Sequence, residues 1–326
     1  MHRASEVMNA VGSEIRSEIN SCLSSINNGY RHFIHQTPLW VLPGKALGID
    51  CGQVWLKLEH LQTGGSFKAR GALYRLLRNT VPASGVVIAS GGNAGITSAA
   101  AAQSMGVPCE VFLPEVSSQA KRDRLRAMGA TVTVTGAAYA DAYAACVARQ
   151  KITGALQNHA YDQLEIVAGA GTVAAEIEAQ QGALPDTMLV SVGGGGLIAG
   201  IAAHCYGRAR VVALEPRLAP TLFEARKAGQ PVDVAVSGIA ADSLGAKRIG
   251  NICWQVQATA VDNALLVEDE AIRAAQLWLW HNLKLAVEPA AALGLAALQT
   301  GVYKPAANET VCLVLCGANM DLGGLN

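Results

Sequence analysis

The sequence predicts an α/β fold of two domains, each built on an open, mostly parallel sheet that is covered by helices. The first observation behind this prediction is that short apolar strands alternate with helical stretches along the chain, as they do in covered parallel sheets. The second is the length of 326 residues, which is long for a single core. The third is composition, because 51% hydrophobic and only 15% charged residues indicate a large core and exclude a disordered chain.

The individual elements follow from local patterns. Residues 54–59 alternate in polarity like a strand, 85–90 form a short buried run, and an alanine-rich helix follows from Asn93. By the same criteria, strands are predicted at 54–59, 85–90, 109–113, 131–135, 155–157, 187–192, 210–214 and 310–315. Helices are predicted at 69–78, 93–104, 121–128, 138–148, 173–180, 197–203, 270–281 and 289–298.

Charge and composition exclude several functional classes. The 25 basic and 25 acidic residues cancel, so nothing favours nucleic acid or an anionic membrane surface as a partner. The longest apolar stretch, 285–298, is interrupted by Glu288 and Pro289 and is too short to span a membrane. Eight cysteines without a CxxC pair are typical of reduced thiols, so we expect a cytoplasmic protein.

A run of four glycines, Gly193 to Gly196, lies between a predicted strand and a predicted helix. Backbone amides without Cβ atoms can approach an anion closely, and the helix dipole favours negative charge there. A tight turn is the simpler interpretation, but four glycines cost more conformational entropy than a turn requires. Leu197 and Ile198 follow, which matches neither the dinucleotide nor the P-loop pattern. We therefore predict an anion site.

Three other segments have both a structural and a chemical interpretation. Lys68 begins a predicted helix, where it is either an exposed lysine or a partly desolvated, nucleophilic amine beside Phe67. The turn from Ser90 to Asn93 either caps a helix or presents polar groups to a carboxylate. Cys316 ends a strand at the sheet edge where ligands bind, although buried cysteine is commonly structural. An amine and an anion site together suit a phosphorylated aldehyde cofactor.

In this order, the motifs resemble those of fold-type II pyridoxal-phosphate enzymes, in the serine/threonine dehydratase family of the tryptophan synthase β-like superfamily. The resemblance extends from His35 to Leu322. It implies pyridoxal 5'-phosphate as cofactor and Lys68 as the catalytic residue that forms the Schiff base. It further implies cofactor contacts from Phe67, Lys68, Asn93, Gly193, Gly194, Gly195, Gly196, Leu197, Glu288 and Cys316. The implied substrate-binding residues are Ser66, Ser90, Gly91, Gly92, Asn93 and Ala94.

The resemblance implies an ammonia-lyase of the threonine or serine dehydratase type. Lys68 would remove the Cα proton of a β-hydroxy amino acid, the hydroxyl would leave, and a 2-oxo acid and ammonia would result. A neutral thiol at Cys316 facing the pyridine nitrogen suits such a β-elimination. The small Ala94 and Ala160 leave room for a bulkier substrate such as phenylserine.

Other functions are weaker interpretations of the same residues. Serine racemases carry a serine where this chain has Gly91, which makes racemisation the less favoured activity. A non-catalytic protein that binds the cofactor or an amino acid would not need Lys68. A protein that binds a nucleotide through the glycine loop would form no Schiff base.

The resemblance also implies the organisation of the chain. Residues 1–72 and 156–326 are expected to form a large cofactor-binding domain, and 73–155 a small substrate-side domain. A homodimer is expected, with no regulatory domain after the catalytic core. No metal is expected: Glu215 matches one family ligand, but Thr221 replaces the aspartate that would complete the site.

Overall fold

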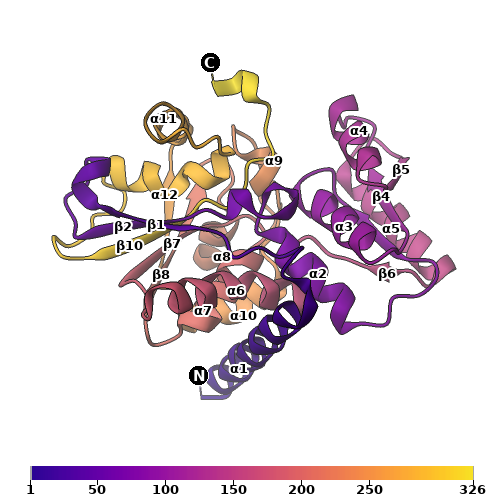
Figure 1. The fold of residues 1–326 in the computed structure, drawn as a ribbon, viewed down its shortest axis with the longest axis horizontal. Coiled ribbons are helices and arrows are strands. Elements are labelled where there is room, and N and C mark those ends of the chain that lie inside the picture. Colours follow the sequence, from indigo (N-terminus) through magenta and orange to yellow (C-terminus); the bar gives the residue numbers. More distant parts are fainter. Residues whose placement is uncertain (1, 326) are drawn as a thin grey trace.

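The computed structural model describes residues 2–325, whose strands form two separate sheets (Figure 1). The larger sheet has six strands in the order β1-β2-β10-β7-β8-β9, and the smaller has four in the order β5-β4-β3-β6. The strands are β1 (Leu39–Pro43), β2 (Gln53–Lys57), β3 (Val86–Ala89), β4 (Cys109–Leu113), β5 (Thr131–Val134), β6 (Leu156–Gln157), β7 (Thr187–Ser191), β8 (Arg210–Pro216), β9 (Asn263–Val267) and β10 (Thr310–Val314). Apart from the antiparallel β1–β2 pair, all named strand pairs are parallel. The predicted fold class is confirmed.

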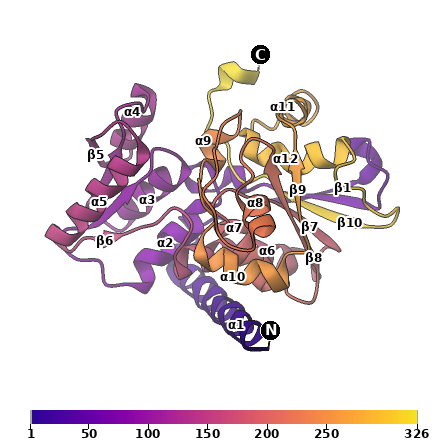
Figure 2. The same cartoon turned by 180° about the vertical axis from the view of Figure 1, so that it is seen from behind.

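Helices cover both faces of the large sheet. Two of them, α11 and α12, lie on one side, and α6 and α7 lie on the other with α1 and α10 outside them (Figures 1 and 2). The helices are α1 (His2–Ser25), α2 (Lys68–Arg78), α3 (Asn93–Ser104), α4 (Gln119–Ala127), α5 (Tyr139–Thr153), α6 (Leu164–Gln181), α7 (Gly196–Cys205), α8 (Thr221–Ala228), α9 (Ala241–Leu244), α10 (Asn251–Ala260), α11 (Asp269–Trp278) and α12 (Pro289–Gln299). Within residues 2–325, none of them has the length and apolar character that a membrane span needs.

The small sheet is also covered on both sides, by α5 on one face and by α3 and α4 on the other. Its side chains alternate between two cores, as strand geometry requires. Val86 and Ile88 join the main core, whereas Val87 and Ala89 pack with α5 in a second cluster. Residues 156–157, which we assigned to the large domain, pair with β3 in the small sheet. The domain boundaries otherwise stay a prediction.

Glycines bring the three helices α2, α6 and α7 into close contact. A Cβ on Gly169 of α6 would lie 2.3 Å from the Cα of Gly71 on α2. A Cβ on Gly200 of α7 would lie 2.5 Å from the backbone nitrogen of Gly171. Only glycine permits such backbone approach. The tight α2–α6–α7 packing places the beginning of α2, with Lys68, beside the beginning of α7, with the glycine loop.

A buried ionic cluster anchors α2 to the large domain. The Arg70 guanidinium donates to Glu59 at 2.7 Å and to Glu176 at 2.9 Å, and Lys57 donates to Glu176 at 2.6 Å. Burial alone would raise the pKa of Glu176, but Arg70 and Lys57 hold it below its ordinary value. Two cations and two anions balance, which is how buried charges are tolerated. The cluster holds the helix turn that follows Lys68.

Candidate active site

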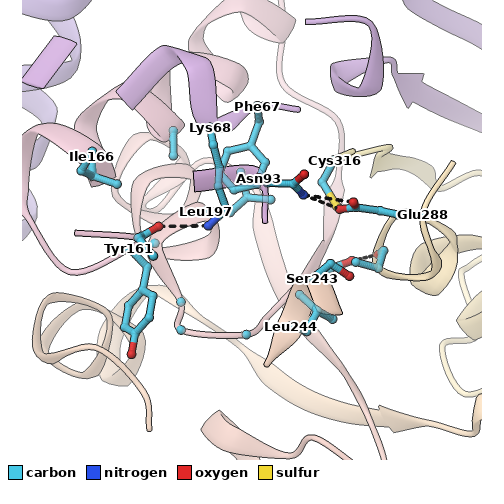
Figure 3. A pocket seen from close by; sticks show the side chains of 18 residues that line it. Phe67, Lys68, Asn93, Tyr161, Ile166, Leu197, Ser243, Leu244, Glu288 and Cys316 are labelled. Atoms are coloured by element: carbon cyan, nitrogen blue, oxygen red, sulfur yellow. Dashed lines mark hydrogen bonds between the residues drawn. The ribbon is translucent and has the colours of Figure 1, made fainter. Parts of the chain in front are cut away.

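One pocket, lined by Asn93 of α3 and by residues around the large sheet, brings together the residues predicted to contact a cofactor (Figure 3). It opens at the beginnings of α2, α3 and α7 and at the end of β10, which is the ligand-binding edge of an open α/β sheet. Its lining includes Phe67, Lys68, Asn93, Gly193, Gly194, Gly195, Gly196, Leu197, Glu288 and Cys316. We call it the cofactor pocket.

Lys68 is partly buried at the first residue of α2. Its Nζ atom donates to the backbone oxygen of Ala160 at 2.9 Å and lies 5.6 Å from the centre of the Phe67 ring. Burial lowers the pKa of this amine, against the opposing influence of Glu288 and Cys316. A lysine with a lowered pKa is nucleophilic and can also serve as a base.

The residues of the glycine loop are glycines because neighbouring atoms leave no room for a Cβ atom. The φ of Gly195 is +90°, and a Cβ there would lie 2.4 Å from the Cys253 sulfur. A Cβ on Gly194 would lie 2.3 Å from the Tyr161 ring. The Gly194 oxygen accepts a bond from the Gly250 nitrogen at 3.0 Å, which fixes the loop. The loop leads into the amino-terminal turn of α7, whose unpaired N–H groups favour an anion.

Hydrogen-bonded polar side chains form a connected series across the pocket, from Glu288 to the C-terminal segment. Asn93 Nδ2 donates to the two carboxylate oxygens of Glu288 at 2.9 and 3.0 Å. Asn319 Nδ2 donates to Asn93 Oδ1 at 2.5 Å and to the Gly64 oxygen at 2.8 Å. Burial raises the pKa of Glu288 to about 7, although Asn93 and Lys68 oppose the rise. Figure 3 shows Asn93, Glu288 and Cys316 pointing toward one another.

Cys316 lies two residues after the end of β10 and is buried. Burial and the nearby Glu288 raise the pKa of its thiol well above the ordinary value, so the thiol stays neutral at physiological pH. The Phe67 nitrogen donates to the Cys316 oxygen at 3.2 Å, and Ser66 pairs with Gly317. This pairing joins the segment before Lys68 to the end of the central strand.

A histidine turn supports the far wall of the pocket. His159 Nδ1 accepts bonds from the backbone nitrogens of Tyr161, at 3.3 Å, and Asp162, at 3.0 Å. The Asp162 carboxylate then accepts bonds from the nitrogens of Asn251 and Ile252 at the beginning of α10. The turn thus fixes both the Ala160 oxygen that faces Lys68 and the Tyr161 ring that covers the glycine loop.

The predicted substrate-binding residues lie in two places. Gly91, Gly92 and Asn93 line a second, larger cavity, which we call the outer cleft. Ser66, Ser90 and Ala94 line neither cavity. The Ser66 hydroxyl is buried without a hydrogen-bond partner among residues 2–325, and Ser90 Oγ accepts a bond from the Gly92 nitrogen at 3.4 Å.

Glu215 lies outside the candidate site. Its two carboxylate oxygens accept bonds from the nitrogens of Leu222 and Phe223, each at 2.7 Å, at the beginning of α8. In the described part of the chain, no group of three histidine, cysteine or acidic side chains could hold a metal ion. Glu215 therefore satisfies helix N–H groups instead.

Sequence reasoning gave no role to several residues that the fold brings to the site. Ser243 and Leu244 line the cofactor pocket from the short helix α9, Tyr161 covers the glycine loop, and Asn319 binds Asn93. Asn319 stands three residues after Cys316, but an asparagine in a loop carries no pattern of its own. Tyr161 and Asp162 stand two and three residues after His159, and this cluster of polar side chains before a helix was the available signal.

The residues present fit pyridoxal phosphate. A Cβ at Gly194 or Gly195 would collide with its neighbours, so the loop leaves bare backbone for a phosphate. Lys68 offers an amine with a lowered pKa to an aldehyde. Cys316 and Asn93 offer a neutral thiol and an amide to the ring of such a cofactor.

Comparison with known proteins agrees with this arrangement. Residues 30–317 match the family model described as "Pyridoxal-phosphate dependent enzyme". The chain is 38% identical to L-threonine ammonia-lyase from Geobacter sulfurreducens over 82% of this chain and 68% of the relative. It is 32% identical to serine racemase from Arabidopsis thaliana over 90% of both chains. The crystal structure of a threonine deaminase from T.th. superposes with a TM-score of 0.85 at 32% identity, covering 94% of this chain and 98% of that one.

Proposed function

The chain belongs to the family of pyridoxal-phosphate dependent enzymes, and on that premise we propose that it is an ammonia-lyase, which converts a β-hydroxy amino acid to a 2-oxo acid and ammonia. The observation that carries the proposal is the pairing of a lysine amine of lowered pKa with a buried neutral thiol across one pocket. The relatives named for threonine ammonia-lyase and threonine deaminase support the same reaction class.

We propose the following roles for the pocket residues. The glycine loop with Leu197 would hold the cofactor phosphate, and the Lys68 amine would bind its aldehyde group. Asn93, Cys316, Phe67 and Glu288 would orient the ring. When bound, pyridoxal phosphate supplies an electron sink for the electron pair that remains after the Cα proton leaves.

The amine of Lys68 then acts as the base at Cα. Its lowered pKa leaves a larger fraction of the amine unprotonated near neutral pH, as a general base requires. The Ala160 oxygen, 2.9 Å from Nζ, keeps the amine at the pocket wall. The turn at residues 90–94 would bind the substrate carboxylate, with Gly91, Gly92 and Asn93 facing the outer cleft.

The neutral thiol favours elimination over slower reactions at the same carbon. A neutral thiol at Cys316 would be only a weak donor to the nitrogen of a bound cofactor ring, which suits loss of the β-hydroxyl. Racemisation is the second candidate, because one relative is a serine racemase. Gly91 opposes it, since it supplies no hydroxyl to return a proton from the face opposite Lys68.

A substrate panel tests the proposal. The enzyme with its cofactor is incubated with serine, threonine and phenylserine in both configurations, and 2-oxo acid and ammonia are measured together with the enantiomer of the remaining substrate. We expect stoichiometric 2-oxo acid and ammonia with little inversion. Inversion without ammonia would favour racemase activity, and inactivity toward every β-hydroxy amino acid would refute the lyase.

We further propose a cytoplasmic homodimer. The eight cysteines are all buried and free of disulfides, as in a reducing compartment. The dimer is supported by the family resemblance, and light scattering coupled to size-exclusion chromatography measures it.

A further inference from the structure

The short helix α9 lies between the turn that we propose binds the substrate carboxylate and the glycine loop. The main-chain oxygen of Asp242 faces that turn, because a Cβ on Gly92 would lie 3.5 Å from it. The Cα atom of Leu244 lies against the glycine loop, because a Cβ on Gly193 would lie 3.0 Å from it. Ser243 stands between Asp242 and Leu244 in the chain. The helix therefore places Ser243 between the sites that a substrate carboxylate and a cofactor phosphate would occupy.

The Ser243 hydroxyl lies where the cofactor pocket meets the outer cleft. Among residues 2–325, three line both cavities: Asn93, Ser243 and Glu288. Two of these are bonded to each other, because Asn93 Nδ2 donates to both carboxylate oxygens of Glu288. Ser243 Oγ has a local bond to the Ala240 oxygen at 3.3 Å, which is long for a hydroxyl donor. Breaking this weak bond costs little, so the hydroxyl can turn to a substrate.

The other hydroxyl groups that line the two cavities have different positions or stronger bonds. Ser191 Oγ donates to a main-chain oxygen of α12 at 2.6 Å. The Tyr161 hydroxyl donates to the main chain at Arg248, and Figure 3 shows it pointing away from Lys68. Two further serines, Ser117 and Ser118, line the outer cleft and not the cofactor pocket. Ser243 is thus the hydroxyl that is both near the reacting atoms and weakly bonded.

The charged donors also leave this position to Ser243. Lys68 is the proposed base at Cα, its Nζ atom is held by a main-chain oxygen, and Figure 3 shows it apart from Ser243. Glu288 has a raised pKa of about 7, but both of its oxygens accept bonds from Asn93. The cations of the outer cleft line that cavity and not the cofactor pocket: Lys121, Arg124 and Arg273.

We propose that Ser243 donates a hydrogen bond to the β-hydroxyl of the substrate and stabilises that oxygen as it leaves. The inference rests on the proposed lyase function and adds a residue to its site. In the elimination, the electron pair of the Cα–H bond forms the second bond between Cα and Cβ. The Cβ–O bond breaks, and its electron pair stays on oxygen. A donor aimed at this oxygen acts most strongly where the charge develops. The proton that Lys68 removes balances the departing hydroxide, so Ser243 transfers no proton.

The experiment compares serine with β-chloroalanine in the holoenzyme, since both give the same 2-oxo acid and ammonia. Chloride is a stable anion and leaves without a donor, whereas a hydrogen bond stabilises departing hydroxide. Ser243→Ala should lower kcat/KM for serine by about 10- to 100-fold and for β-chloroalanine by less than about 3-fold. Ser243→Thr keeps the hydroxyl and should restore most of the serine activity relative to β-chloroalanine. Ser237→Ala, at an exposed serine that lines neither cavity, is the control and should change neither value.

Cofactor binding separates a direct contact from a structural role. Titration of the apoenzyme with pyridoxal phosphate should give the same dissociation constant for Ser243→Ala and for the wild type. Weaker cofactor binding, or equal losses for serine and β-chloroalanine, would show that Ser243 supports the pocket and would overturn the inference. Full serine turnover by Ser243→Ala would show that another donor serves the hydroxyl, and would overturn it as well.

Failure of the lyase proposal looks different. A wild type that releases ammonia from β-chloroalanine but from no β-hydroxy amino acid would refute the proposed function, and this inference with it. A wild type that is active on serine, with a Ser243→Ala variant that loses both substrates equally, would refute the inference alone.

Discussion

The cofactor pocket and the outer cleft share Asn93 and Glu288 but are built differently. The pocket is formed by backbone and buried groups: a glycine loop, a neutral thiol and an amine held by a main-chain oxygen. The cleft is lined by side chains of α3, α4 and α11 and of intervening segments, and its outer rim, with Val116, Arg124 and Asp321, is exposed. Bare backbone tolerates almost no substitution, whereas exposed side chains can change without loss of the fold. The comparison indicates that residues of the cofactor pocket determine the reaction, whereas residues of the outer cleft determine which substrate is bound.

Lys68→Ala should give the largest effect in the pocket. Removing the amine removes both the cofactor attachment and the proposed base, so turnover should fall by about 1,000-fold or more. The visible absorbance band of the attached cofactor should disappear as well. Lys45→Ala, at an exposed lysine, is the control. Retention of the band and of turnover would show that another amine performs the chemistry.

Gly194→Ala should weaken cofactor binding by about 10- to 100-fold. The new Cβ would lie 2.3 Å from the Tyr161 ring, and either the loop or the ring has to move. The dissociation constant is measured by titrating the apoenzyme with pyridoxal phosphate. Gly12→Ala on α1, where the nearest atom is 3.6 Å away, is the matched control. Adding Tyr161→Ala should restore part of the affinity, and failure of that rescue would contradict the steric explanation.

His159→Ala should weaken cofactor binding by about 10-fold, and His159→Asn should restore much of it. Asparagine also offers an acceptor to backbone N–H groups two and three residues on. Burial lowers the pKa of His159, so the folded protein favours the neutral ring. The stability that the neutral ring contributes is present above the unfolded pKa of about 6.5 and declines as the pH falls below it.

Thermal unfolding between pH 5 and pH 8 checks this dependence. The wild type should lose stability relative to His159→Asn toward the acidic end. Parallel curves for the two proteins would show that His159 does not contribute in this way.

Asp242→Asn should have the smallest effect and should leave the pocket intact. The Lys121–Asp242 pair is exposed and is worth less than about 1 kcal/mol of unfolding free energy. Cofactor affinity should be unchanged, and stability should shift little in thermal melts at low salt. A large loss of cofactor affinity would show that side chains of the outer cleft also determine cofactor binding, which contradicts the comparison.

The secondary structure was predictable where the local pattern was strong. The bounds of β4 and α3 agree with the prediction, and α12 differs by one residue. The edge strands β1 and β9 were missed, because β1 contains Pro43 and β9 begins with Asn263 and Ala264, residue types that are depleted in strands. Helix α6 begins at Leu164, nine residues before the predicted start, since its first turns are rich in glycine and are stabilised by contact with α2.

The sequence alone determined the class of fold and the anion loop, because these depend on periodicity and on a run of glycines that few other roles require. Local context left Lys68 and Cys316 open between a structural and a chemical role, and the family resemblance of the whole motif set chose between them. Only the tertiary structure decided what surrounds them: the Ala160 oxygen at Lys68, Tyr161 over Gly194, and Asn319 between Asn93 and Arg124. These contacts join residues far apart in the chain, up to 226 positions for Asn93 and Asn319. Such contacts leave no local pattern, since packing and hydrogen bonding act on distance in space and not on order in the chain.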